Sequence, residues 1–275
     1  MSVRTSRWLT FGFLASPYNS IQNFVGYHLP KGLAPQGSDP RRVFTTGWPC
    51  NLRAMEQVRA ARAARYAVDF MNAQHGSPLR SYDQGKLHSW KRNEDDKGAD
   101  YQVEFEVEEQ PSKRKLKLAA TVLFPHGRET PRVNITSEMS PCEEVGDEAW
   151  EEILRKYPGE PLGETIPDNF GHVPDNKTAL LRLARIAGSV INLENGGEHK
   201  TYDVQRINLV ALSLLSRDSL RIFDYEVIAV EMPTQEIVLC YLTVAWQKGE
   251  PIRVKYLCPK LAALEMLGGK EEDSI

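Results

Sequence analysis

The residues of this chain that could do chemistry are few and scattered. Its four cysteines form no CxxC pair, and their spacing does not match a zinc site. Its six histidines are dispersed, which argues against a metal cluster. The chain contains no HExxH, GxSxG, P-loop or GxGxxG motif. We therefore expect a protein that is not an enzyme and that holds neither a cofactor nor a metal.

Two of the cysteines can be paired from the expected strand register. If a hairpin turns at residues 248–250, Cys240 and Cys258 face each other on antiparallel strands. Facing residues of such strands lie within disulfide distance. We predict a Cys240–Cys258 disulfide, which leaves Cys50 and Cys142 as a possible second pair.

Several features favour a secreted protein. Residues 1–16 have the basic, apolar, small-residue order of a secretory signal segment. Asn134 and Asn176 each begin an N-x-[ST] sequon, so both are candidate glycosylation sites. We expect secretion, with a cytoplasmic location as the alternative.

The bulk composition excludes two classes of partner. The 275 residues carry a formal net charge of −3, so no overall positive field exists to hold nucleic acid or an anionic membrane. No apolar run is long enough to span a bilayer. We expect no nucleic-acid partner and no membrane partner.

The first structured part reads as a helix followed by an antiparallel sheet. A Pro- and Gly-rich extension covers residues 17–50, and apolar residues at helical spacing predict a helix from 51 to 74. Alternating apolar and charged residues predict strands at 101–108, 113–124 and 132–136. A turn at Gln110-Pro111 would set Glu106 opposite Lys115.

The second part repeats the first. Six residues of the first helix recur 120 positions later, while later matches fall at spacings of 122 and 121, which predicts an internal duplication. The matches at a spacing of 120 are Arg62, Ala64, Arg65, Ala67, Asn72 and Gly76 with Arg182, Ala184, Arg185, Ala187, Asn192 and Gly196, and 106–107 with 226–227. Those at 122 and 121 are 121–122 with 243–244 and 132–133 with 253–254. We expect the two extra residues in the hairpin at 232–236. That loop is either a recognition site or a surface turn that has drifted.

The segment between the copies predicts a short helix over 147–157, followed by a Pro- and Gly-marked spacer at 164–173. In chain order, we expect a signal segment at 1–16, an extension at 17–50 and a first subdomain at 51–140. A linker helix and spacer at 141–175, a second subdomain at 176–258 and a flexible tail at 259–275 follow.

A helix packed on an antiparallel sheet, made twice, resembles a tandem of cystatin-like units, and specific motifs resemble the latexin family. The motifs are 62–64, 67, 70–72, 74 and 76–78 in the first helix, 166–171 in the spacer and 234–237 in the late hairpin. The resemblance covers about residues 53–258. It implies an α+β fold of two cystatin-like subdomains, each a helix on a curved antiparallel sheet, joined by a linker helix.

The same resemblance implies inhibition of zinc metallocarboxypeptidases of the A/B type. It places Gln235 and Glu236 as enzyme contacts, with Thr234 and Ile237 shaping the loop. The acidic end at 271–275 offers a second route, as a substrate-like terminus. Residues 253–258 with Cys240 resemble the secreted branch of the family, which includes an eggshell matrix protein. Mineral and matrix proteins are therefore possible partners, and a matrix or binding module without inhibitory activity is the alternative.

Overall fold

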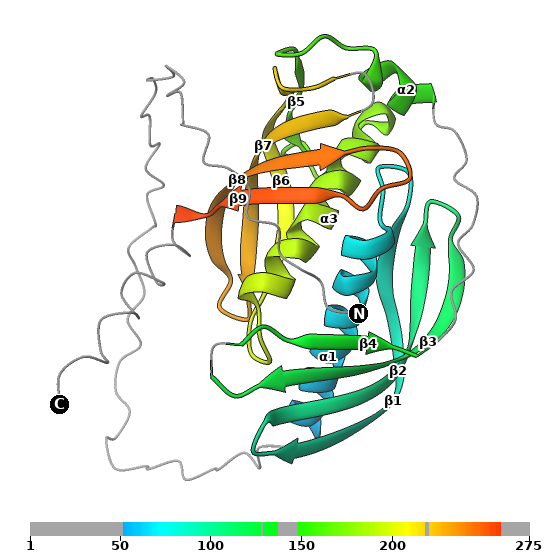
Figure 1. Cartoon of the computed structure of the whole chain (residues 1–275), viewed down its shortest axis with the longest axis vertical. Helices are drawn as coiled ribbons and strands as arrows, with labels where there is room; N and C mark the ends of the chain where they lie inside the picture. The colour runs from blue at the N-terminus through cyan, green and yellow to red at the C-terminus, as the bar shows by residue number, and fades with distance from the viewer. Residues whose placement is uncertain (1–51, 128, 137–147, 218–219, 260–275) are drawn as a thin grey trace, which may run out of the picture. The chain divides into compact units, whose positions relative to one another are not determined.

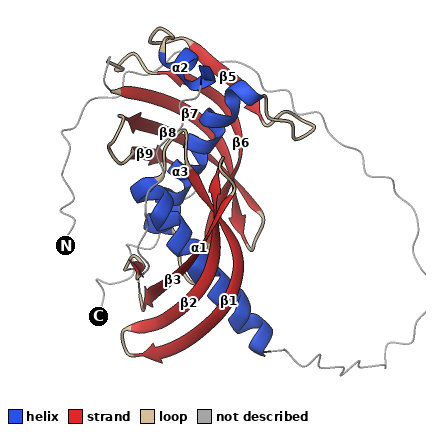
Figure 2. Ribbon diagram, turned by 90° about the vertical axis from the view of Figure 1, so that its right-hand side faces the viewer, coloured by secondary structure: helices blue, strands red, loops and turns tan. Residues whose placement is uncertain are grey.

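The structure is a computed structural model that describes residues 52–127, 129–136, 148–217 and 220–259. It is an α+β structure with two antiparallel sheets, one of four strands and one of five (Figures 1 and 2). None of the helices in these ranges has the length and apolar character needed to cross a membrane. The expected signal segment, the N-terminal extension, Cys50 and Cys142 lie outside the described residues.

The first half consists of one long helix and the four-stranded sheet. Its elements are α1 (Leu52–His75), β1 (Ser81–Asp95), β2 (Gly98–Gln110), β3 (Arg114–Pro125) and β4 (Arg132–Ile135). Small residues such as Ala60, Ala63 and Ala67 let α1 approach the sheet closely, and they are fully buried. Phe124 packs edge-on against Tyr66 of α1, with ring centroids 5.1 Å apart.

The second half consists of another long helix and the five-stranded sheet. Its elements are α2 (Glu148–Leu154), β5 (Pro161–Ile166), η1 (Asp175–Lys177), α3 (Thr178–Asn195), β6 (Thr201–Leu212), β7 (Arg221–Met232), β8 (Glu236–Trp246) and β9 (Arg253–Leu257). α3 has leucines and isoleucines at helical spacing, and these are buried against the sheet.

The segment expected to link the halves belongs largely to the second half. Trp150 of α2 is buried between Phe223 and Trp246, with ring centroids 5.5 and 5.3 Å away. β5, which includes the start of the expected spacer, pairs with β6 at the edge of the second sheet. α2 is therefore anchored by an aromatic cluster, which fixes it on the second core.

The predicted alternation in the first sheet is confirmed, but its predicted register is wrong. Residues 103, 105 and 107 of β2 are buried, and the glutamates between them lie on the other face. Glu106 pairs with Lys117, and Glu108 pairs with Lys115, so Glu106 does not face Lys115. Residues 110–113 lie in the turn, outside the β2–β3 ladder, so the centre of the hairpin lies one residue later than predicted. Each residue of β2 therefore faces a residue of β3 two positions beyond the predicted partner.

The two halves share detailed hydrogen-bonding geometry. The Asn72 side chain donates to the carbonyl of Tyr82 and accepts from its N–H, at 2.9 and 2.8 Å. Asn192 makes the same two bonds with Tyr202, at 2.9 and 2.5 Å. Each asparagine ties the end of its helix to the start of the following strand.

The pairing registers correct the expected site of the two extra residues. Each half has a hairpin with a four-residue turn, residues 110–113 in the first half and 232–235 in the second. In each turn the second residue is a cis proline, and the fourth has positive φ, Lys113 (φ 58°) or Gln235 (φ 63°). The two hairpins are the same length. Tyr82 corresponds to Tyr202 and Glu109 to Glu231, so the spacing has risen from 120 to 122 before the second hairpin begins. Glu106 therefore corresponds to Ile228, and the match expected with Glu226 is wrong. The insertion lies in the β6–β7 connection instead.

The predicted disulfide is confirmed. Cys240 and Cys258 are bonded, with Cα atoms 4.3 Å apart. Tyr241 pairs with Leu257 in the β8–β9 ladder, which is the register expected from a turn at 248–250. The bond fixes the end of β9 against β8.

Candidate functional site

The hairpin between β7 and β8 carries all four residues expected to contact an enzyme. Thr234, Gln235, Glu236 and Ile237 are all exposed. Glu231 and Glu236 form the last pair of the ladder, and residues 232–235 form the tip. The structure therefore brings the four predicted residues together on one exposed hairpin, two in its turn and two at the start of β8.

Local hydrogen bonds define the shape of this tip. The Gln235 N–H donates to the Glu231 carbonyl at 2.8 Å, and the Met232–Pro233 peptide is cis. The Thr234 hydroxyl donates to Glu231 Oε1 at 3.2 Å and accepts from the Glu236 N–H at 3.3 Å. Thr234 thus acts as a brace within the loop, in agreement with the shaping role that the family resemblance implies.

The base of the hairpin is held from β6. The Tyr202 hydroxyl donates to Glu231 Oε2 at 3.4 Å, and Lys200 Nζ lies 3.7 Å from the same oxygen. Lys200 also lies 5.2 Å from the centre of the Tyr202 ring. Burial raises the pKa of Tyr202, so its hydroxyl stays a proton donor to Glu231 at neutral pH.

A groove of about 350 Å³ lies beside the hairpin, at the junction of the two halves. One wall comes from α1 and includes Val58, Ala61, Arg62 and Arg65. The opposite wall comes from the start of β6 and from Met232 and Pro233 of the hairpin. The hairpin and the helix of the other half thus form one continuous surface.

Buried polar contacts fix the junction itself. The Ser189 hydroxyl donates to Asp69 Oδ1 at 2.7 Å, and the Asn192 amide donates to Oδ2 at 3.0 Å. Arg65 Nε lies 3.4 Å from Oδ1. Burial raises the pKa of Asp69 to about 6, against the opposing effect of Arg65 and the two donors. Asp69 and Ser189 occupy corresponding positions in α1 and α3. The two helices contact each other directly, and these polar bonds lie in that contact.

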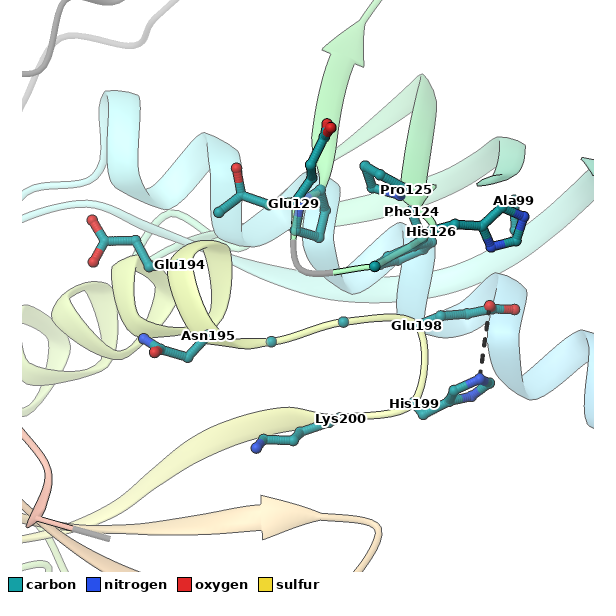
Figure 3. Close-up of a pocket in the computed structure, with 15 residues that line it drawn as sticks. Ala99, Phe124, Pro125, His126, Glu129, Glu194, Asn195, Glu198, His199 and Lys200 are labelled. Atoms are coloured by element: carbon teal, nitrogen blue, oxygen red, sulfur yellow. Dashed lines mark ion pairs between the residues drawn. The ribbon is translucent and has the colours of Figure 1, made fainter. Parts of the chain in front are cut away.

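A second, larger cleft lies at the other side of the same junction. It has a volume of about 600 Å³ and is formed by the loop after β3 and the turn between α3 and β6 (Figure 3). His126 and Glu129 line the first wall, and Glu194 and His199 the second. Within the described part of the chain, no three His, Cys, Asp or Glu side chains are grouped as metal ligands would be.

Glu198 in this cleft was missed by the sequence reasoning. The Tyr101 hydroxyl donates to its Oε1 at 2.6 Å, and Arg59 and Arg92 lie 3.7 and 3.8 Å away. Burial and then the bond to Glu198 raise the pKa of Tyr101 to about 12. Glu198 therefore joins the turn after α3 to α1 and to the first sheet. Its partners are distant in sequence, so no local pattern signals this role.

The remaining predicted residues are dispersed. Asn134 is exposed on β4, the edge strand of the first sheet, and Asn176 is exposed in η1. Both side chains are thus placed where a glycan could be attached. Neither is part of the hairpin site.

These features define an α+β protein whose candidate site is a preformed surface at the junction of two helix–sheet halves. The family model described as Latexin matches residues 53–263, and the chain belongs to the latexin family. Latexin of Homo sapiens is 33% identical over 217 residues, which cover 75% of this chain and 96% of that protein.

Two further relatives differ in how much of their length is matched. Retinoic acid receptor responder protein 1 of Homo sapiens is 28% identical over 230 residues, which cover 78% of this chain and 76% of that protein. Ovocalyxin-32 of Gallus gallus is 32% identical over 110 residues, which cover 40% of each chain. These relatives agree with the family expected from the sequence motifs.

Proposed function

We propose that this protein inhibits zinc metallocarboxypeptidases of the A/B type. The observation that carries the proposal is the exposed, internally braced hairpin of residues 232–235, which lies beside the groove at the junction. Membership of the latexin family supports it. A hairpin held by its own hydrogen bonds loses little conformational freedom on binding, which favours tight association.

In this proposal the hairpin covers the entrance of the enzyme's active site. Gln235 and Glu236 supply polar groups toward a positive, zinc-bearing cleft. Thr234 holds the turn, and Ile237 lies exposed at its base. The neighbouring wall of α1 extends the contact beyond the tip, so that both halves of the inhibitor touch the enzyme.

The proposal includes an architecture of two cystatin-like subdomains that arose by duplication. Supporting it are the matching asparagine–tyrosine contacts, Asn72 with Tyr82 and Asn192 with Tyr202. The two hairpins of equal length, each with a residue of positive φ at its fourth position, add further support. Buried residues of α2 and β5 belong to the core of the second half, and β5 is a strand of the second sheet. We therefore place the start of the second subdomain before residue 176.

Titration into carboxypeptidase A, with a chromogenic peptide substrate, tests the inhibition. We expect Gln235→Ala and Glu236→Ala each to weaken inhibition about tenfold or more if they are central contacts. Lys113→Ala is a matched control, because Lys113 has the same positive φ at the same place of the other hairpin. It should leave inhibition unchanged.

Two results would argue against the proposal. An absence of inhibition at micromolar protein would remove the inhibitory function and leave a binding or matrix role. Inhibition that survives both hairpin variants but disappears when residues 271–275 are deleted would assign the activity to a substrate-like C-terminus. The hairpin would then have no part in it.

We also propose that the protein is secreted and belongs to an extracellular matrix, such as that of eggshell. The similarity to Ovocalyxin-32 supports this role, and so does the Cys240–Cys258 disulfide, because such bonds persist in oxidising compartments. The exposed sequons at Asn134 and Asn176 agree with it. If the purified protein neither binds calcite nor alters its growth at low ionic strength, the mineral-binding part is wrong.

A further inference from the structure

The outer face of the second sheet carries an exposed apolar patch. We define the outer apolar patch as Ile228, Val230, Ile237, Leu239, Tyr241 and Leu257. Ile237 is 64% exposed, Tyr241 45% and Leu257 47%. The residues are contiguous, since Val230 pairs with Ile237, Ile228 with Leu239, and Tyr241 with Leu257. The intervening residues of β8 face the core, so the patch lies on the side of the sheet away from α3.

The first sheet shows that this fold does not require apolar residues here. At the corresponding places it has two facing pairs of opposite charge, Glu106 with Lys117 and Glu108 with Lys115. A sheet face that meets water normally carries polar residues. Because the two sheets match in register, the patch is a property of the second sheet alone. Contiguous exposed apolar surface marks a contact with another segment or molecule.

The chain leaves the second sheet beside this patch. β9 pairs with residues 241–245 of β8 and ends at Leu257. The disulfide then places Cys258 against Cys240, with Cα atoms 4.3 Å apart. The residues after Cys258 therefore start beside β8 between Ile237 and Tyr241, which are both in the patch. From 236 to 240, β8 is paired on one side only, by β7, in the described structure.

The sequence after Cys258 fits this surface in character and in length. Pro259 has helical backbone conformation, and proline favours the first position of a helix. Leu261, Leu264 and Leu267 share one side of a helix that Gly268 and Gly269 would end. Nine residues of helix span about 13.5 Å. The strand from Ile237 to Tyr241 spans about 13 Å.

We propose that residues 259–267 form a short helix whose leucines cover the outer apolar patch of the same molecule. The match of the family model extends to residue 263, so it includes the first part of this segment. Residues 260–275 lie outside the described residues, and the proposal rests on the patch and the sequence.

Hydrogen exchange of the full-length protein, followed by mass spectrometry, tests the proposal. We expect amides of residues 260–267 to exchange at least about tenfold more slowly than in an unstructured peptide. The double variant Ile228→Glu/Leu239→Lys, which copies the Glu106–Lys117 pair, should remove this protection and leave that of β7 and β8 intact. The reverse exchange on the first sheet, Glu106→Ile/Lys117→Leu, should not affect residues 260–267.

Three outcomes would overturn the proposal. The segment could exchange at the unstructured rate in the native protein. Its protection could persist in the Ile228→Glu/Leu239→Lys variant. Protection could also depend on protein concentration, with a dimer in analytical ultracentrifugation that the double variant abolishes. In that last case a second copy of the chain, and not its own C-terminal segment, covers the patch.

Discussion

Replacing Asp69 with asparagine should change how the stability of this protein depends on pH. Asp69 is fully buried at the contact of α1 with α3, and burial raises its pKa from 3.8 to about 6. In the unfolded chain the same carboxyl ionises near pH 4. Between these values the folded state keeps a proton that the unfolded state has lost. The contribution of Asp69 to stability is therefore fully present below about pH 4 and is lost as the pH rises through about 6.

The magnitude follows from the size of the shift. A difference of about two pKa units corresponds to about 3 kcal/mol of free energy of unfolding. Relative to Asp69→Asn, the native protein should thus lose up to about 3 kcal/mol between pH 4 and pH 7. Other carboxyl groups titrate in both proteins, so the difference between the two isolates the contribution of Asp69.

Urea denaturation of both proteins at intervals from pH 4 to pH 7.5 measures this difference. Asp203→Asn is the matched control, because Asp203 Oδ1 lies 3.7 Å from Arg65 Nη2 but is half-exposed on β6. That variant should retain the decline. A difference between native protein and Asp69→Asn that stays constant across the pH range would refute the reasoning. It would mean that the junction keeps Asp69 ionised.

Two further predictions concern the disulfide and the contact between the two halves. Replacing both Cys240 and Cys258 with alanine should lower the free energy of unfolding by about 3 kcal/mol, since the bond closes a loop with a sequence separation of 18; urea denaturation should show a similar loss when the native protein is reduced. A Cβ at Gly196 would lie 1.8 Å from the Tyr66 hydroxyl, so Gly196→Ala should destabilise by about 1–3 kcal/mol in thermal unfolding. Gly197→Ala, where a Cβ meets nothing within 4 Å, should change little; equal effects would contradict the argument.

Much of the fold could be predicted from periodicity, because most elements have one buried face. The helix α1, the alternation of β2 and the β8–β9 register follow from local patterns, and α3 follows from the repeat of the first helix. β1 and β6 were not predicted. Each contains two register shifts against its neighbour, and every shift moves the side chains to the opposite face. The sequence of such a strand therefore does not alternate regularly between apolar and polar residues, and periodicity does not reveal it.

The candidate site was less accessible to prediction than the fold. Residues 234–237 were identified through resemblance to a family. The repeat spacing pointed to the same loop for a wrong reason, because the two extra residues do not lie there. The hairpin geometry depends on a cis peptide and on a positive φ at Gln235, neither of which is visible in the sequence. The groove and Glu198 depend on contacts between residues about 100 or more positions apart. Such contacts are set by how the two halves pack.

The contact between Asp69 and Ser189 also bears on which helices can meet. Two molecules that joined through their first halves, α1 against α1, would bring two buried Asp69 carboxyls together. Two second halves would place serine against serine. No carboxylate would then accept the hydrogen bonds that the Ser189 hydroxyl and the Asn192 amide donate. Only α1 with α3 gives each group a complementary neighbour. The unlike residues at this one place thus favour pairing of a first half with a second half over pairing of two like halves.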